Sequence, residues 1–225
     1  MILTNDDGVD APGLQVLFEK LQRVGQVIVA APDGPCSGVG HQVTTHSPIE
    51  VKKVAAGRYS IKGTPADCTR IGLKVLAPDA DWLIAGINPG ANLGSDVYNS
   101  GTVAAAREGA ILGIRSMAIS QYVARDHVID WDITARHADS VVKMLLERPL
   151  EKGGFWNVNL PHPLDFEFER GYEFCDLDTG PHAYVYRQEG LNYFYEGTIH
   201  ERHRQAGRDV DVCFGGKVAI TLLKV

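Results

Sequence analysis

Short apolar runs alternate with amphipathic stretches along most of the chain. Buried strands are expected at 2–3, 27–31, 82–87, 116–120 and 156–160, where the residues are mostly apolar. Apolar runs of this length are typical of parallel strands that are covered on both faces. Between them, apolar residues recur at helical spacing, as Leu14, Leu17 and Leu21 do. Helices are expected at 11–21, 64–76, 103–112 and 132–146.

Polar residues at the predicted helix starts support these boundaries. Thr64-Pro65-Ala66-Asp67 combines a hydroxyl cap, a proline in the first turn and an acid three residues after the cap. Ser100 precedes the alanine-rich helix, and Asp132 is expected to cap the last one.

The character of the sequence changes after Pro149. Tyrosines and glycines dominate between Tyr172 and Tyr195, and helical periodicity disappears there. A smaller hairpin is expected where 49–51 and 59–61 alternate around Gly57. We therefore predict one domain over 1–225, with an α/β core at 1–160, a β-rich hairpin excursion at 161–216 and a returning strand at 217–225.

The alternation of strand and helix predicts the fold class. It indicates an α/β protein with three α/β/α layers, a mainly parallel Rossmann-like sheet and a C-terminal β-hairpin excursion. In such sheets, ligands bind at the carboxyl ends of the strands. The loops that follow strands are therefore the first place to look for chemistry.

Composition narrows the partners and the compartment. Apolar residues make up 44% of the 225 residues, enough for a sizeable core. The formal net charge of −6 argues against a nucleic-acid polymer or an anionic membrane as partner. The four cysteines are scattered, and we find neither a signal peptide nor an apolar stretch of about 18 residues. We expect a soluble, cytoplasmic protein.

Two adjacent acids follow the first predicted strand, in Thr4-Asn5-Asp6-Asp7-Gly8. Gly8 permits the turn that would bring both carboxylates to one place. Carboxylates held close together repel unless a cation or a shared proton intervenes, and a divalent metal ion is one such cation. The same residues fit an ordinary turn in which Asp6 and Asp7 cap the next helix.

Two later loops add donors to this pair. Ser37 lies in the long connection after 27–31, and Asn88 follows 82–87. Because loops after parallel strands open on one edge of the sheet, we expect both residues near Asp6 and Asp7. This all-oxygen set suits Mg²⁺, Mn²⁺ or Ca²⁺, and the histidines show no zinc-binding spacing.

The segment Ser100-Gly101-Thr102 opens a predicted helix and is a candidate anion site. Free backbone N–H groups, the positive end of the helix dipole and two hydroxyls can hold a phosphate. Alone, the segment is better explained as a plain helix cap, because Ser and Thr are favoured at any helix start. The expected metal donors nearby favour the phosphate interpretation.

Other candidates carry less chemistry. His41, in the long loop, could contact substrate or donate a proton. Cys36 is expected to pack rather than to react. We expect 209–211 to be a solvated loop and 200–204 to be an exposed face that could supply positive charge at a subunit contact.

The motifs above, in this order and spacing, resemble the survival protein E (SurE) family of metal-dependent nucleotidases. The matching segments are 4–8, 31–33 with Ser37, 40–41, 63–68, 86–94 and 100–103. The resemblance covers 1–160 and returns faintly at 207–222. Ala85 stands where the family usually has serine, and the sequence stops at Val225, whereas the family commonly continues into a C-terminal segment exchanged between subunits.

The resemblance implies a phosphatase that hydrolyses nucleoside 5′- and 3′-monophosphates, with polyphosphate cleavage left open. It implies one divalent ion per subunit at Asp6, Asp7, Ser37 and Asn88, the set already reached from strand order. It also implies a homodimer or homotetramer, and substrate contacts from Gly38, His41, Asn92, Ser100, Gly101 and Thr102.

The expected chemistry is in-line attack on phosphorus by a metal-activated water, with Asp6 and Asp7 as the catalytic carboxylates that anchor the ion, one of which could also orient or deprotonate the water. Two other functions share these residues. One is a phosphatase in which Asp6 or Asp7 forms an aspartyl-phosphate. The other is a non-catalytic, Mg²⁺-binding signalling module like a receiver domain, which also places paired acids after its first strand.

Overall fold

A mixed sheet forms the middle layer of the molecule. The computed structural model describes residues 1–162, 171–182, 184–197 and 199–225. Within these residues the sheet contains nine strands: β1 (Ile2–Thr4), β2 (Ile28–Pro32), β3 (Glu50–Ala55), β4 (Arg58–Lys62), β5 (Trp82–Pro89), β6 (Arg115–Gln121), β7 (Gly154–Leu160), β8 (Tyr172–Phe174) and β11 (Val218–Lys224). Their spatial order is β3-β4-β2-β1-β5-β6-β7-β11-β8.

The central strands run parallel, as predicted. Strands β4, β2, β1, β5, β6 and β7 pair in parallel, whereas β3 and β11 are antiparallel to β4 and β7. The chain builds the sheet outward from β1 on one side to β2 and on the other to β5, so β1 lies at the switch point of the topology. Thr4 pairs with Ala85, and the loops after β1 and β5 therefore leave the sheet side by side.

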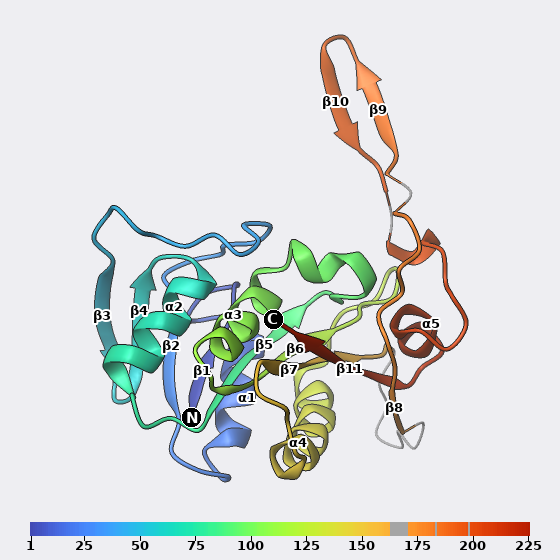
Figure 1. Cartoon of the computed structure of the whole chain (residues 1–225). Helices are drawn as coiled ribbons and strands as arrows, with labels where there is room; N and C mark the ends of the chain where they lie inside the picture. Colours follow the sequence, from blue (N-terminus) through green and yellow to red (C-terminus); the bar gives the residue numbers. More distant parts are fainter. Residues whose placement is uncertain (163–170, 183, 198) are drawn as a thin grey trace.

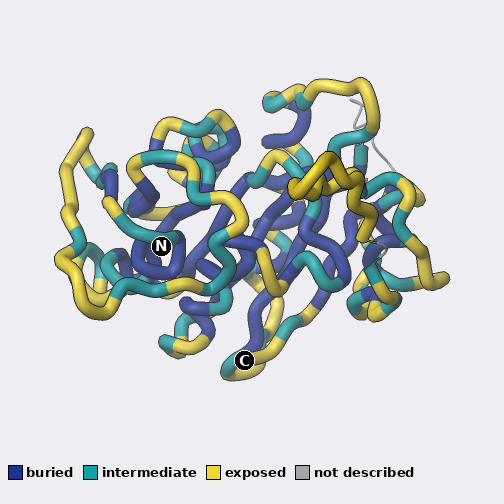
Figure 2. Tube along the Cα trace, turned by 90° about the horizontal axis from the view of Figure 1, so that it is seen from above, coloured by how far each residue is buried: buried dark blue, intermediate teal, exposed yellow. Residues whose placement is uncertain are grey.

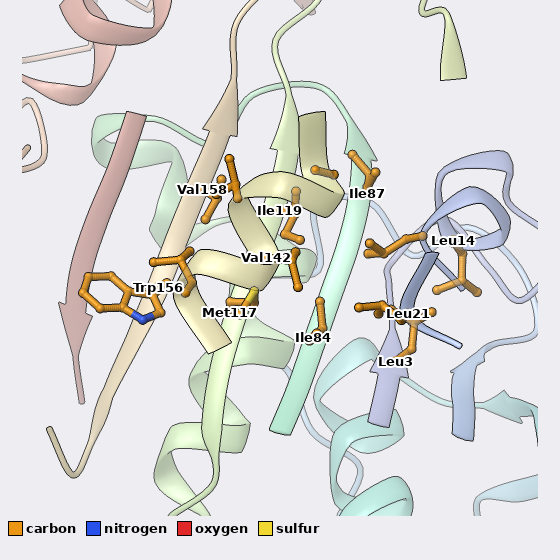
Figure 3. Packing of buried hydrophobic residues seen from close by; sticks show 14 of the residues in the cluster. Leu3, Leu14, Leu21, Ile84, Ile87, Met117, Ile119, Val142, Trp156 and Val158 are labelled. Atoms are coloured by element: carbon orange, nitrogen blue, oxygen red, sulfur yellow. The ribbon is translucent and has the colours of Figure 1, made fainter. Parts of the chain in front are cut away.

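Helices cover both faces of this sheet (Figure 1). Helices α1 (Pro12–Leu21) and α4 (Trp131–Glu147) pack on one face, and α2 (Pro65–Ile71) and α3 (Gly101–Ile111) pack on the other. Because side chains alternate along a strand, neighbouring residues enter different cores. Leu3 and Ile84 pack beneath α1 and α4 (Figure 3), whereas Ile2 and Leu83 belong to the opposite core. The predicted three-layer α/β/α fold is confirmed.

The helix starts follow the expected chemistry at α2 and α3. The Thr64 hydroxyl accepts the Asp67 backbone N–H at 3.2 Å, and the Asp67 carboxylate accepts the Thr64 N–H at 3.0 Å. A π-helical turn, η1 (Gly72–Leu76), continues α2 to the predicted end. Ser100 caps α3 by accepting the Val103 N–H at 3.0 Å.

The cap predicted for α4 was wrong by two residues. Asp130, not Asp132, accepts the backbone N–H groups of Asp132 and Ile133, each at 3.0 Å. Asp132 instead lies in the first turn, where its negative charge interacts favourably with the positive end of the helix dipole.

The C-terminal excursion contributes both to the sheet and to a projecting hairpin. Strand β8 pairs in parallel with β11 at the sheet edge, a pairing the sequence did not indicate. Strands β9 (Tyr186–Glu189) and β10 (Asn192–Tyr195) form an antiparallel hairpin that projects from the body (Figure 1). Both strands are exposed along their length (Figure 2). Part of the predicted 161–216 segment lies outside the described residues.

Two expectations for this region were wrong. Residues 209–211 begin a short helix, α5 (Asp209–Phe214), because the fully buried Asp209 carboxylate accepts backbone N–H groups from Gly94, Asp178 and Val210. Nor is 200–204 wholly exposed, since the Arg202 side chain is 8% exposed and pairs with an acid. Within the described residues, no helix has the length and apolar character needed to cross a membrane.

Candidate active site

A compact turn holds the two acids at the end of β1. The Asn5 side chain is fully buried and bonds Gly8 twice, donating to its carbonyl at 3.0 Å and accepting its N–H at 3.2 Å. Gly8 has a φ of +110°, a conformation that few other residues adopt. The turn therefore takes the chain away from the strand immediately after Asp6 and Asp7.

The long loop after β2 (Ile28–Pro32) is bonded directly to this turn. The backbone N–H of Cys36 donates to the carbonyl of Asp6 at 2.7 Å, which places Ser37 beside the acids. Burial, with smaller contributions from Asp33 and Asp6, raises the pKa of the Cys36 thiol, and this agrees with the expectation that Cys36 is not a nucleophile.

One cavity of about 460 Å³ opens at this edge of the sheet. Eight residues that the sequence assigned to metal or substrate line it: Asp6, Asp7, Ser37, Gly38, Asn88, Asn92, Ser100 and Gly101. They come from loops after β1, β2 and β5 (Trp82–Pro89) and from the start of α3 (Gly101–Ile111). The strand-edge argument thus brought these loops together correctly, whereas the role of each residue stays a prediction.

Burial dominates the electrostatics of the acid pair. Asp6 is 5% exposed, and burial raises its pKa despite the opposing hydrogen bonds from Thr102. Asp7 is less buried, and burial together with the charge of Asp6 raises its pKa to about 6. Two desolvated carboxylates side by side create a local need for positive charge.

The donors fit a hard divalent cation. The buried Oδ2 atom of Asp7 has no hydrogen-bond partner among the described residues, so a carboxylate oxygen remains available at the cavity. The Asn88 Nδ2 atom donates to the Gly90 carbonyl at 2.7 Å, which leaves the amide oxygen as the end that can bind a cation. No cluster of three or more His, Cys, Asp or Glu side chains suited to a metal occurs in the described parts of the chain. A site here would therefore depend on the neutral oxygens of Ser37 and Asn88 as well as on the two acids.

The N-terminus of α3 approaches the acids closely. A Cβ atom on Gly101 would lie 2.8 Å from the Cβ of Asp6, so glycine is needed for this approach. Ser100 and Gly101 line the cavity, where a helix N-terminus suits an anion. Thr102 does not line it, because its buried hydroxyl donates to the Asp6 carboxylate. In this structure Thr102 therefore contacts Asp6, and its predicted contact with phosphate stays a prediction.

His41 also lies outside the cavity lining. Its Nε2 atom is 2.7 Å from Oε2 of Glu108, whose other oxygen accepts from Arg70 Nε at 2.6 Å. Glu108 is 2% exposed and belongs to α3. The contact therefore ties the long loop to α3, and the predicted contact of His41 with substrate stays a prediction.

Sequence reasoning missed residues on two sides of the site. Asn157 and Asn159, in the buried strand β7 (Gly154–Leu160), donate to the Asn92 carbonyl at 2.9 and 3.1 Å and so fix that loop. Two asparagines in an otherwise apolar strand were a readable signal. His182 and Tyr195 also line the cavity, but they come from the excursion, where no local motif marks them.

The fold and the site define a class: a Rossmann-like α/β protein in which two adjacent acids meet a helix N-terminus at the carboxyl edge of the sheet. The family model for survival protein SurE matches residues 1–181. The chain belongs to this SurE family.

Relatives cover the chain from end to end. A Synechocystis sp. protein, whose name gives 5′-nucleotidase as an assumed activity, is 46% identical and aligns over 100% of this chain and 99% of its own length. The 5′-nucleotidase SurE of Erythrobacter litoralis is 35% identical and aligns over 100% and 93%. The crystal structure of the SurE protein from Aquifex aeolicus superposes with a TM-score of 0.88 at 34% identity, covering 99% of this chain and 92% of that one.

Proposed function

We propose that this SurE-family protein is a 5′-nucleotidase that hydrolyses nucleoside monophosphates to a nucleoside and phosphate with the help of a divalent cation. The relatives named as 5′-nucleotidases support the reaction class. The observation that carries the proposal is the meeting of buried Asp6 and half-buried Asp7, which has an oxygen without a partner among the described residues, at a cavity bordered by the N-terminus of α3 (Gly101–Ile111).

Each residue has a distinct part in this proposal. Asp6, Asp7, Ser37 and Asn88 would hold one Mg²⁺ or Mn²⁺ ion. When bound, such an ion neutralises phosphate charge and activates water as a nucleophile. Thr102 fixes the orientation of Asp6 by donating to it.

The N-terminus of α3 would receive the phosphate. The Ser100 hydroxyl and the Gly101 backbone N–H would provide donors, whereas the Val103 N–H is already bonded to Ser100. The close approach of Gly101 to Asp6 brings these donors near the acids. Donors fixed in advance stabilise the charge of the transition state without reorganising. Asn92, which lines the cavity and is bonded through its backbone, would add an amide contact.

Phosphate release tests the proposal. We expect the protein to release phosphate from adenosine 5′-monophosphate with Mn²⁺ and to lose this activity in EDTA. Asp6→Asn should abolish activity at saturating Mn²⁺, and an active Asp6→Asn variant would overturn the metal assignment. Acid quenching with radiolabelled substrate separates direct attack by water, which leaves the protein unlabelled, from an aspartyl-phosphate.

Substrate range and assembly are tested in the same preparation. We expect activity on nucleoside 3′-monophosphates as well, and inorganic polyphosphate belongs in the same panel. Light scattering should give the mass of a dimer or tetramer.

A further inference from the structure

The C-terminal excursion supplies one wall of the cavity that holds the acids. Four of its residues line this cavity: His182, Tyr195, Gly197 and Ile199. His182 and Tyr195 have aromatic side chains, whereas the expected metal and phosphate donors all lie in the α/β core. The lining therefore combines oxygen donors from the core with an imidazole and a phenol ring from the excursion.

His182 is held in place from two directions. Its Nε2 atom lies 3.0 Å from Oδ1 of Asp96, and the guanidinium of Arg202 binds the other carboxylate oxygen of Asp96 at 2.5 Å. The imidazole also stacks on the ring of Tyr184, with centroids 4.9 Å apart and planes 14° from parallel. These contacts fix the ring as part of the wall.

Gly197 and two neighbouring tyrosines surround the Tyr195 ring. A Cβ atom on Gly197 would lie 2.2 Å from the Tyr195 hydroxyl, so any other residue at position 197 would require the ring to move. The rings of Tyr184 and Tyr186 lie 6.1 and 5.6 Å from that of Tyr195, within the usual range for aromatic pairs. These contacts favour this ring position, although Tyr195 itself is 52% exposed.

A ligand that matches both kinds of lining residue is a phosphate ester with a planar aromatic group. We infer that His182 and Tyr195 form a nucleobase subsite, which makes the protein favour nucleoside monophosphates over phosphate esters without a base. The volume of about 460 Å³ lies within the range of small-molecule sites. Stacking accepts every base, so purine and pyrimidine nucleotides should both bind. This inference rests on the proposed nucleotidase function.

The test compares an ester that has a base with one that lacks it. With Mn²⁺ present, Tyr195→Leu should lower kcat/KM for adenosine 5′-monophosphate about tenfold, mainly through KM, because base stacking is lost. Hydrolysis of ribose 5-phosphate should not change. Tyr195→Phe should restore the preference for the nucleotide. Tyr193→Leu, on the same exposed strand but outside the cavity lining, should behave as the unmodified protein does.

The possible outcomes separate the subsite from the function. Equal losses on both esters, or no loss on the nucleotide, would overturn the subsite while leaving the nucleotidase proposal in place. A loss of similar size in Tyr193→Leu would also overturn it, because the effect would then belong to the hairpin as a whole. If the unmodified protein hydrolyses neither ester with Mn²⁺, the proposed function fails first. Thermal unfolding of each variant shows that it is folded.

Discussion

Replacing Asp7 by Asn should stabilise the protein when no metal is bound. Burial and the neighbouring Asp6 raise the pKa of Asp7 to about 6, against an ordinary value of 3.8. A shift of that size corresponds to roughly 3 kcal/mol against the charged, folded form. Because solvent screens part of this cost at a partly exposed position, we expect Asp7→Asn to recover about 1–3 kcal/mol at pH 7.5.

The pH dependence follows from the same shift. Between about pH 4 and pH 6 the unfolded chain loses the Asp7 proton before the folded protein does, so stability falls as the pH rises through this window. Above about pH 7 the carboxyl is ionised in both states, and the penalty is complete. The Asn variant has no such proton, and its stability should fall less over the same window.

Chemical unfolding, once in EDTA and once in Mn²⁺ without EDTA, measures the change in stability and its dependence on the metal. Mn²⁺ should stabilise the unmodified protein strongly and the Asp7→Asn variant weakly, because a ligand that binds only the folded state stabilises it. Asp10→Asn, which removes an exposed acid from the same turn, is the control and should change neither value. A loss of stability on Asp7→Asn in EDTA, or an unchanged pH dependence, would refute the argument that Asp7 is held at a cost.

Three other substitutions test contacts around the site and in the fold. Gly101→Ala forces a methyl group against Asp6 and should cost about 1–3 kcal/mol of unfolding free energy and most of the activity. Glu108→Ala removes the carboxylate that binds Arg70 and contacts His41 and should cost about 1–3 kcal/mol, with weaker Mn²⁺ binding measured by calorimetry. Asp130→Ala removes the true cap of α4 (Trp131–Glu147) and should cost about 1 kcal/mol by urea unfolding, more than Asp132→Ala does.

For each of these substitutions, one outcome would contradict the prediction. Gly34→Ala meets no atom within 4 Å and is the control for Gly101→Ala, so equal losses would show that the close approach to the acid is unimportant. Unchanged Mn²⁺ affinity in Glu108→Ala would show that the His41–Glu108 contact is not needed to position the long loop that carries Ser37. A larger loss in Asp132→Ala than in Asp130→Ala would contradict the observed cap.

The core and the acid-bearing loops of the site were predictable because they depend on local rules. Apolar runs set the strands, and the Thr64 and Ser100 caps set two helix starts. Parallel strands bring their carboxyl ends to one edge, which was enough to bring the loops of Asp6 and Asn88 together.

The remaining features depend on contacts between residues far apart in the chain. Asp209 looked like part of a solvated acidic loop, but its carboxylate accepts the backbone N–H of Gly94, 115 positions away, at 2.7 Å. Similarly, His41 faces Glu108 rather than the cavity, because the loop folds back onto α3 (Gly101–Ile111). Nothing near Tyr195 in the sequence indicates that it reaches the site.

The acids and the aromatic wall formed by His182 and Tyr195 are held in place by different contacts. The acids follow a fully buried strand in the middle of the sheet, where any change disturbs close packing. The aromatic wall depends on a few carboxylates, Asp96 and Asp209, that bind a segment with exposed strands beside it. Substitutions in that segment should therefore alter which ester is accepted while hydrolysis itself persists, whereas substitutions at Gly101 should reduce both. The ratio of activities on adenosine 5′-monophosphate and ribose 5-phosphate distinguishes the two cases, because only loss of the aromatic wall changes it.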